Sequence, residues 1–281
     1  MKILPKGSEY MARTIAFIGV GNMAGAIING ITREDSPARV AWTDLVLFDK
    51  FEAQCAPYAE RGATVASSVA DAAGCADCVV LSVKPQNFPE ILPELAAVAG
   101  IENKLIVTIA AGITSDSVRE ALGGAPVVRV LPNTPMLIGM GVSAVCRSEY
   151  VSGEDFSFVC GLFEASGQVL LIDESEMNRI ISVTSSSPAY VFAFIKAICD
   201  GATAQGLDGA AMTRAVCDMV IGSATLLRDG GLTPEEQIKR VTSKGGTTEQ
   251  AMAVLGARDM NGIMTDAMAA CTRRADELSR S

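Results

Sequence analysis

Short runs of consecutive apolar residues alternate with segments of helical spacing through the first half of the chain. The apolar runs are rich in β-branched residues and only a few residues long, which is typical of strands buried on both faces of a parallel sheet. Their alternation with helical segments predicts βαβ units, and therefore an α/β fold with a doubly wound, mostly parallel sheet. The runs predict strands at residues 14–18, 45–48, 78–83, 105–109, 127–130, 142–146 and 168–172.

The strand pattern stops after about residue 173. Several of the helical segments that follow are apolar all round, as at residues 216–221, and helices of this kind are normally buried. A helical region of about a hundred residues cannot bury them all by itself, so we expect a homodimer through an all-α dimerisation domain at residues 173–281. The pattern predicts helices at 175–204, 209–228, 234–242 and 249–273, with turns at Gly206, Gly230-Gly231, Gly245-Gly246 and Gly256.

The first predicted strand runs directly into a G-x-G-x-x-A turn, followed by a helix-compatible stretch over residues 24–31. In such a motif the first glycine makes the turn, and the second lets the backbone approach a pyrophosphate. The small third residue keeps the helix close to the strand. We therefore predict a Rossmann-type dinucleotide-binding domain at residues 11–172 for a nicotinamide or flavin nucleotide, although a glycine turn without a ligand is the alternative. The residues of this turn are Gly19, Val20, Gly21, Asn22, Met23 and Ala24.

The second predicted strand ends at Asp49-Lys50. An acidic residue at this strand end commonly accepts the hydroxyls of the adenosine ribose and favours NAD. Lys50 could instead meet a 2′-phosphate, so both NADPH and NADH stay open as cofactors. Asp49 also lies farther from the glycines than the usual spacing of about 20 residues, and a solvated loop aspartate is an alternative interpretation.

Three further predicted strands end in loops of small or polar residues. The carboxyl ends of the strands are where open α/β sheets bind their ligands. Three such loops at one sheet edge indicate a site, and we predict cofactor contacts from all of them. The residues are Ser82, Val83, Lys84, Pro85, Ala110, Ala111, Gly112, Pro132 and Asn133.

Near the C-terminus the chain reads Val-Thr-Ser-Lys-Gly-Gly-Thr-Thr over residues 241–248, just before a helix-compatible segment. Two glycines among hydroxyl residues weaken a helix. They would leave backbone N–H groups bare at a helix N-terminus, where an anion is favoured. The stretch therefore predicts an anion site, the alternative being a glycine turn with Thr248 as a simple N-cap.

The composition limits the catalytic groups and the partners that the chain can have. The chain contains no histidine, which removes the commonest general acid and base, so the chemistry must use another proton source or a substrate that needs little help. Its net charge is −9 and it has no lysine or arginine cluster, so nucleic acid is not an expected partner. We find no uninterrupted apolar run of about 18 residues, and expect no membrane partner.

Eight cysteines are scattered without a pairing rhythm, as expected for reduced thiols in a cytoplasmic protein. Cys75-x-x-Cys78 has no second pair, so we expect no metal site. The first ten residues have no apolar core of a secretory signal. Met11 is a second candidate start, and the ten residues before it would then form a disordered extension.

Three stretches in order resemble the pyrroline-5-carboxylate reductase family: residues 17–24, residues 83–86 with 129–135, and residues 241–248, the last being the family's signature. The likeness runs from about Arg13 to Met268. It implies a Rossmann domain and a helical domain that interlocks with a second subunit, with a ring of dimers as a further possibility. It also implies reduction of 1-pyrroline-5-carboxylate to L-proline with NADPH or NADH.

The same resemblance implies where the substrate binds. Its carboxylate would lie on backbone N–H groups around Gly246 and Thr247, and the Thr248 hydroxyl would hydrogen-bond the ring nitrogen as the catalytic group. The implied substrate-binding residues are Ser243, Gly245, Gly246, Thr247 and Thr248.

The chain departs from the family's pattern in three places. Ser185 and Ser187 replace glycines of a Gly-Ser-Gly-Pro-Ala-Tyr stretch, which puts close helix packing there in doubt. Lys244 replaces a proline, so the signature loop would be less rigid and more positive. An asparagine expected just before Val69 is absent, and Ser68 is its substitute as a cofactor contact.

Two other functions are alternatives. A β-hydroxyacid dehydrogenase would use a lysine on the first interdomain helix, and Lys196 stands in a suitable segment, although a lysine that only reaches solvent fits there too. A non-catalytic nucleotide sensor would keep the glycine turn alone. Cofactor preference, feedback by proline and the ring sizes accepted are left open.

Overall fold

The computed structural model describes residues 13–36 and 38–279, so the question of Met1 or Met11 as the start lies outside them. Its contacts divide the chain into two compact units. The first contains the described residues up to Ser186 and those from Cys271 onward, and the second contains Ser187–Ala270. The predicted domain boundary after residue 172 stays a prediction. The contacts place the division later because Met177 and Ile181 pack in one cluster with Leu131 and Ala144 of the sheet.

The first unit is built on one eight-stranded sheet in the order β3-β2-β1-β4-β5-β6-β7-β8. All neighbouring strands are parallel except β6 and β7, which are antiparallel. The prediction of a mostly parallel sheet is therefore confirmed. The strands are β1 (Ile15–Ile18), β2 (Leu45–Phe48), β3 (Thr64–Val65), β4 (Cys78–Leu81), β5 (Leu105–Thr108), β6 (Val127–Leu131), β7 (Gly141–Arg147) and β8 (Gly167–Leu171).

Only β3 was not predicted. It has two residues, and both are exposed. An exposed pair of this length carries neither an apolar run nor an alternating pattern, so the hydrophobic pattern does not reveal it.

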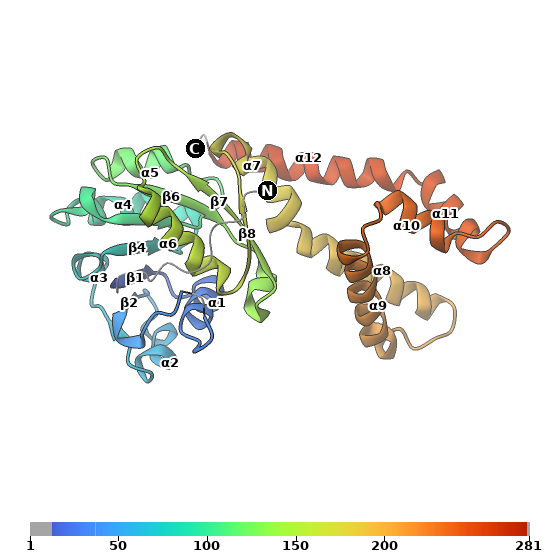
Figure 1. Ribbon diagram of the computed structural model, residues 1–281, viewed down its shortest axis with the longest axis horizontal. Coiled ribbons are helices and arrows are strands. Elements are labelled where there is room, and N and C mark those ends of the chain that lie inside the picture. The colour runs from blue at the N-terminus through green and yellow to red at the C-terminus, as the bar shows by residue number, and fades with distance from the viewer. Residues whose placement is uncertain (1–12, 37, 280–281) are drawn as a thin grey trace. The chain divides into compact units, whose positions relative to one another are not determined.

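Helices cover both faces of the sheet, as predicted for a doubly wound fold (Figure 1). In β1, Ile15 and Phe17 face the core that contains α1 (Asn22–Ile31) and α6 (Gly153–Glu164). Ala16 and Ile18 face the other core, formed with α3 (Val69–Gly74), α4 (Phe88–Ala96) and α5 (Ser115–Ala121). Burial on both sides explains the uninterrupted apolar run of this strand.

Short helical segments connect these elements. They are α2 (Ala56–Ala59), the 3₁₀ turns η1 (Trp42–Asp44), η2 (Glu52–Gln54), η3 (Pro85–Asn87), η4 (Ile101–Asn103), η5 (Thr134–Ile138) and η6 (Glu174–Glu176), then α7 (Met177–Ile180) and the π-helical turn η7 (Ile181–Ser185).

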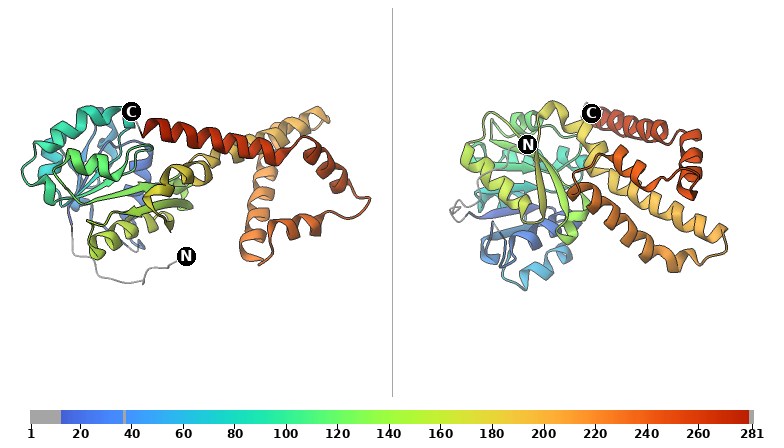
Figure 2. Two further views of the ribbon diagram at one scale, coloured as in Figure 1. Left: turned by 90° about the horizontal axis from the view of Figure 1, so that it is seen from above. Right: turned by 45° about the vertical axis from the view of Figure 1, so that its right-hand side comes forward.

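The second unit is helical, with α8 (Ser187–Ala204), α9 (Gly209–Asp229), α10 (Pro234–Val241), α11 (Thr247–Ala257) and the beginning of α12 (Met260–Leu278). The neighbouring helices α8 and α9 pack against one another (Figure 2). The prediction of one helix over residues 175–204 is wrong. The helical run changes to a π-helical turn and restarts at Ser187-Pro188, where proline is tolerated because first-turn N–H groups have no intrahelical acceptor.

The predicted helix over residues 249–273 is likewise two helices. Its break lies at Asp259, whose φ is 52°, rather than at Gly256, which stays inside α11. Aspartate adopts this left-handed conformation more readily than most residues other than glycine. The Asp259 carboxylate accepts the N–H of Gly262, at 3.1 Å, so it also caps the start of α12.

Large apolar side chains of α8 and α9 are exposed in this chain, including Phe192, Phe194, Ile221 and Leu226. By length and composition, the segments Glu174–Ala204 and Gly209–Asp229 could also cross a membrane, a test that core helices of soluble proteins pass as well. These helices are therefore apolar enough to need a covering partner.

A buried polar network joins the C-terminal end of α12 to the sheet within the first unit. Arg129 of β6 is 1 % exposed and donates to Glu174 Oε1 at 2.7 Å and to Asn178 Oδ1 at 3.0 Å. Asn178 in turn donates to Asp276 Oδ1 at 2.9 Å. Hydrogen bonding of this kind is what a buried guanidinium requires.

Candidate functional site

The glycine turn after β1 can form only with glycine at its first position. Gly19 has φ +93°, a conformation that other residues rarely adopt. A Cβ at this position would also lie 2.8 Å from Val83 Cγ1. The turn is thus packed directly against the end of β4. At Gly21, in contrast, an added Cβ would meet no described atom within 4 Å, so a ligand can approach the backbone there.

The N-terminus of α1 fits a phosphate. Its N-cap is Gly21, and its first turn reads Asn-Met-Ala-Gly, without an acidic side chain. The N–H groups of Asn22 and Met23 have no intrahelical acceptor at this position of a helix. Together with the helix dipole they favour an anion.

Asp49 holds the glycine turn from the side of β2. Its Oδ2 accepts the N–H of Val20 at 2.7 Å, and its Oδ1 accepts the N–H of Phe51 at 2.9 Å. The sequence suggested a ribose acceptor or a solvated loop aspartate. The structure rules out the solvated loop, because both oxygens bind main-chain N–H groups.

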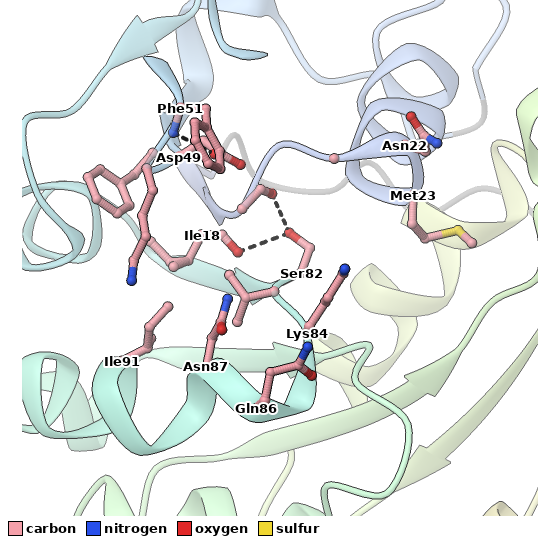
Figure 3. A pocket seen from close by; sticks show the side chains of 15 residues that line it. Ile18, Asn22, Met23, Asp49, Phe51, Ser82, Lys84, Gln86, Asn87 and Ile91 are labelled. Carbon is pink, nitrogen blue, oxygen red and sulfur yellow. Dashed lines mark hydrogen bonds between the residues drawn. The ribbon is translucent and has the colours of Figure 1, made fainter. Parts of the chain in front are cut away.

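Ser82 holds the turn from the side of β4. Its hydroxyl lies 2.6 Å from the carbonyl oxygen of Gly19 and 3.2 Å from that of Ile18 (Figure 3). The backbone adds a third link, since the Gly19 N–H donates to the Phe48 carbonyl at 2.8 Å. The turn is therefore anchored to both strands that flank β1.

A cavity of about 520 Å³ lies at the carboxyl ends of β1, β2 and β4. Figure 3 shows Asn22 and Met23 on α1, across the cavity from Gln86, Asn87 and Ile91 on the η3–α4 side. Nine of the lining residues belong to the predicted cofactor set: Gly19, Gly21, Asn22, Met23, Asp49, Lys50, Ser82, Val83 and Lys84. The six lining residues outside that set are Ile18, Phe48, Phe51, Gln86, Asn87 and Ile91.

The lining residues outside the predicted set divide into two groups. Ile18 and Phe48 are the last residues of β1 and β2, so the strand-end rule that found their neighbours also covers them. Gln86 lies in the stretch 83–86 that carries the family resemblance, so the same strand-end rule reaches it. Phe51 in the loop after β2, Asn87 in η3 and Ile91 in α4 lie farther along the chain, where no pattern in the sequence indicates proximity to the turn.

The other predicted cofactor residues have different surroundings. Val20 and Ala24 are buried, and Pro85 starts η3. Ser68 caps α3 by accepting the Asp71 N–H at 3.0 Å. At Gly112, with φ +79°, an added Cβ would lie 2.7 Å from Leu278 Cβ, so this glycine admits the end of α12. Ala110 and Pro132 are buried, and Ala111 packs in the cluster that includes Ala275 of α12.

Asn133 uses both ends of its side chain internally. Its amide donates to the Thr184 carbonyl at 3.1 Å, and its oxygen accepts the Val142 N–H at 2.8 Å. It is 7 % exposed. These bonds join the end of β6 to β7 and to the π-helical turn, which gives Asn133 a structural role whatever else it contacts.

The loop over residues 243–246 lies in the second unit and leads into α11. Gly245 has φ +75°, and its N–H donates to Glu249 Oε2 at 2.8 Å. The Gly246 N–H donates to the Ser243 carbonyl at 3.0 Å. The prediction of bare N–H groups is therefore wrong for both glycines. It applies only to the first residues of α11, Thr247 and Thr248, whose N–H groups have no intrahelical acceptor.

Cys75 and Cys78 do not act as a pair. Both are free, Cys75 being exposed and Cys78 buried in β4. Burial raises the pKa of the Cys78 thiol to about 12, so it stays protonated at neutral pH. Among the described residues, no group of three or more His, Cys, Asp or Glu side chains is arranged to hold a metal ion.

Comparison with known proteins gives two family matches. A family described as pyrroline-5-carboxylate reductase dimerisation matches residues 174–278, which include the loop and α11. A family described as NADP oxidoreductase coenzyme F420-dependent matches residues 14–112, which include the glycine turn.

Curated relatives named pyrroline-5-carboxylate reductase match almost the whole chain. The protein from Escherichia coli K12 is 33 % identical, covering 96 % of this chain and 100 % of the relative. That from Pseudomonas aeruginosa is 36 % identical over 94 % and 96 %, and that from Arabidopsis thaliana is 32 % identical over the full length of both. The chain belongs to the pyrroline-5-carboxylate reductase family.

Solved structures of the family have the same fold. A pyrroline-5-carboxylate reductase from Coxiella burnetii superposes with a TM-score of 0.86 at 27 % identity, covering 96 % of this chain and 100 % of that one. The Plasmodium falciparum pyrroline carboxylate reductase with NADP bound gives a TM-score of 0.85 at 22 % identity, covering 96 % and 99 %. The predicted fold class, a Rossmann-type α/β sheet followed by helices, is thus confirmed.

Substitution of Gly19 tests the glycine turn. We expect Gly19→Ala to weaken nucleotide binding by about tenfold or more, because the new methyl group collides with Val83 in a conformation that alanine avoids. Isothermal titration with NADP⁺ measures the effect. Gly74→Ala is the matched control, since a Cβ there would meet no described atom within 4 Å. Equal affinities of both variants and the parent protein would contradict this account of the turn.

Proposed function

We propose that this chain catalyses the NADPH- or NADH-dependent reduction of 1-pyrroline-5-carboxylate to L-proline, the last step of proline biosynthesis. The observation that carries the proposal is the combination, in one member of this family, of an open glycine turn and a hydroxyl-rich loop leading into α11. The reaction needs a dinucleotide and a small anionic ring to be held together, and these are the two elements that suit them.

The first unit would hold the cofactor. The amides of Asn22 and Met23 would bind its pyrophosphate, and the exposed Lys84 adds positive charge to the same cavity. Phe48, Phe51 and Ile91 supply apolar surface for the adenine ring. When bound, the cofactor supplies the hydride that reduces the imine carbon.

The second unit would hold the substrate. Its carboxylate would bind the free amides of Thr247 and Thr248, with the exposed Ser243 hydroxyl as a further donor. Gly245 and Gly246 contribute by shaping this loop, since their own N–H groups already have acceptors. Hydrogen bonds to a charged group contribute about 1.5–3 kcal/mol each.

The chemistry suits a chain without histidine. A cyclic imine has an electrophilic carbon of its own, and its ring nitrogen must bear a proton after reduction. If the imine binds already protonated, no strong general acid is needed. The half-buried Thr248 would orient the ring nitrogen through its hydroxyl, and orientation of this kind supplies much of the rate in such a reaction.

We further propose a homodimer in which the cofactor of one subunit meets the loop of its partner. The exposed apolar side chains of α8 and α9 support this arrangement, because a second copy would cover them. A ring of dimers, a cytoplasmic location, and the absence of membrane and nucleic-acid partners belong to the same proposal.

The two alternatives are less well supported. Lys196, the candidate base of a β-hydroxyacid dehydrogenase, is exposed and pairs with Asp200 at 2.6 Å on the same helix, as an ordinary surface lysine does. The hypothesis of a non-catalytic nucleotide sensor does not explain the hydroxyl-rich loop before α11.

An assay of cofactor oxidation tests the main proposal. The oxidation of NADPH or NADH is measured by the loss of cofactor absorbance. We expect it on addition of 1-pyrroline-5-carboxylate and not on addition of a β-keto acid. Turnover of the keto acid that depends on Lys196 would support the dehydrogenase instead. Cofactor binding without turnover of either compound would support the sensor.

Variants of Thr248 test its role. We expect Thr248→Val to lower kcat/KM by about tenfold to a thousandfold, because it removes the hydroxyl while keeping the side-chain shape. Thr248→Ser keeps the hydroxyl and should recover most of the activity. Steady-state kinetics decide the point: a Thr248→Val enzyme with unchanged kcat and KM would exclude the hydroxyl from the mechanism.

Complementation tests the shared site. Gly19→Ala and Thr248→Val chains with different tags would be co-expressed, and the mixed dimer purified through both tags. If the site uses both subunits, one intact site forms per mixed dimer, and activity returns to about half of the parent value. If each chain builds its own site, the mixed dimer is no more active than the two variant homodimers.

A further inference from the structure

Three charged side chains near the end of β2 bear on the choice of cofactor, two on the loop that follows β2 and one on α4. Asp49 and Lys50 line the cavity, and Glu90 lies on α4 next to the lining residue Ile91. The two cofactors differ only in a phosphate on the adenosine ribose. Discrimination between them must therefore come from groups at this end of the site.

Asp49 is committed to the glycine turn. Its two oxygens accept the N–H groups of Val20 and Phe51 at 2.7 and 2.9 Å. The carboxylate thus acts as part of the main-chain scaffold, and any contact with a ribose hydroxyl would be additional to these two bonds. The remaining charged lining residue of β2's end is Lys50.

Lys50 is already paired. Its Nζ lies 2.6 Å from Glu90 Oε2, and the two side chains are 53 % and 58 % exposed. An exposed ion pair of this kind is weak, because water screens the attraction and both side chains lose conformational freedom. Lys50 can therefore leave Glu90 for a more strongly charged partner, and a phosphate is such a partner.

We propose that Glu90 sets the discrimination between NADPH and NADH, by competing with the 2′-phosphate for the Lys50 ammonium. The inference rests on the proposed binding of the dinucleotide at the glycine turn. With Glu90 in place, binding of NADPH requires Lys50 to leave its partner and places a phosphate near a carboxylate. NADH makes neither demand. Glu90 is thus a specificity-determining residue that acts through Lys50.

This proposal is tested by measuring the affinities of the full-length protein for NADP⁺ and NAD⁺ with isothermal titration calorimetry. We expect Glu90→Gln to tighten NADP⁺ binding by about two- to fivefold and to leave NAD⁺ binding within about twofold. Lys50→Gln should weaken NADP⁺ binding by about three- to tenfold with the same indifference to NAD⁺. The double variant Lys50→Gln/Glu90→Gln should bind NADP⁺ with the same affinity as Lys50→Gln alone.

Glu94→Gln is the matched control, because it removes the same charge from the next turn of α4, at an exposed residue outside the cavity lining. An equal effect of Glu94→Gln would attribute the change to the general field and overturn the proposal. So would a Glu90→Gln variant with an unchanged ratio of the two affinities. The proposed cofactor site fails separately, if neither nucleotide binds the parent protein or if Gly19→Ala leaves both affinities unchanged.

Discussion

The candidate site depends on the contact between Gly19 and the end of β4. The ends of β1 and β4 lie so close together that a methyl group added at Gly19 would lie 2.8 Å from Val83 Cγ1. This proximity lets one serine hydroxyl bond two carbonyls of the turn. On the other side, Asp49 holds the Val20 amide. A turn fixed on both sides has its remaining amides oriented before a ligand arrives, which lowers the entropy lost on binding.

In the loop before α11, too, acceptors within the protein take up some of the backbone N–H groups. There, Glu249 takes the Gly245 amide and the Ser243 carbonyl takes that of Gly246. Only the first amides of the helix are left for an external anion. In both places, internal acceptors shape the backbone, and helix geometry presents the amides that remain. Each of the two compact units thus has a helix N-terminus with amides left over, which suits the proposed binding of a dinucleotide and a carboxylate.

The helices of the second unit pose a different physical constraint. Their large apolar side chains are not covered within one chain, and exposure on this scale is costly in water. A second copy that covers them would also bring a second loop to the assembly. Stability and catalysis would then depend on the same interface, which explains why a helical region with so little core of its own can be retained.

Elements whose signals are local could be predicted from the order of the residues. Burial on both faces produces an apolar run, so seven of the eight strands were predicted and only the two-residue, exposed β3 was missed. The G-x-G-x-x-A turn was also predicted, because its glycine requirement follows from a few consecutive residues. The helix break at Ser186 was missed, since a proline tolerated in a first turn leaves the apolar period unchanged. The break between α11 and α12 was placed at Gly256 and lies at the left-handed Asp259.

The hydrogen-bond partner of each polar group, in contrast, depends on the folded arrangement of the chain. The sequence predicts cofactor contacts for Asp49, Ser68 and Asn133, and these stay predictions; the hydrogen bonds that each also makes within the protein could not be read from the sequence. Gly112 likewise lies against Leu278, from a distant part of the chain. A residue's type shows what it can bond, whereas its partner depends on which strand ends and helices the fold brings within about 3 Å of it.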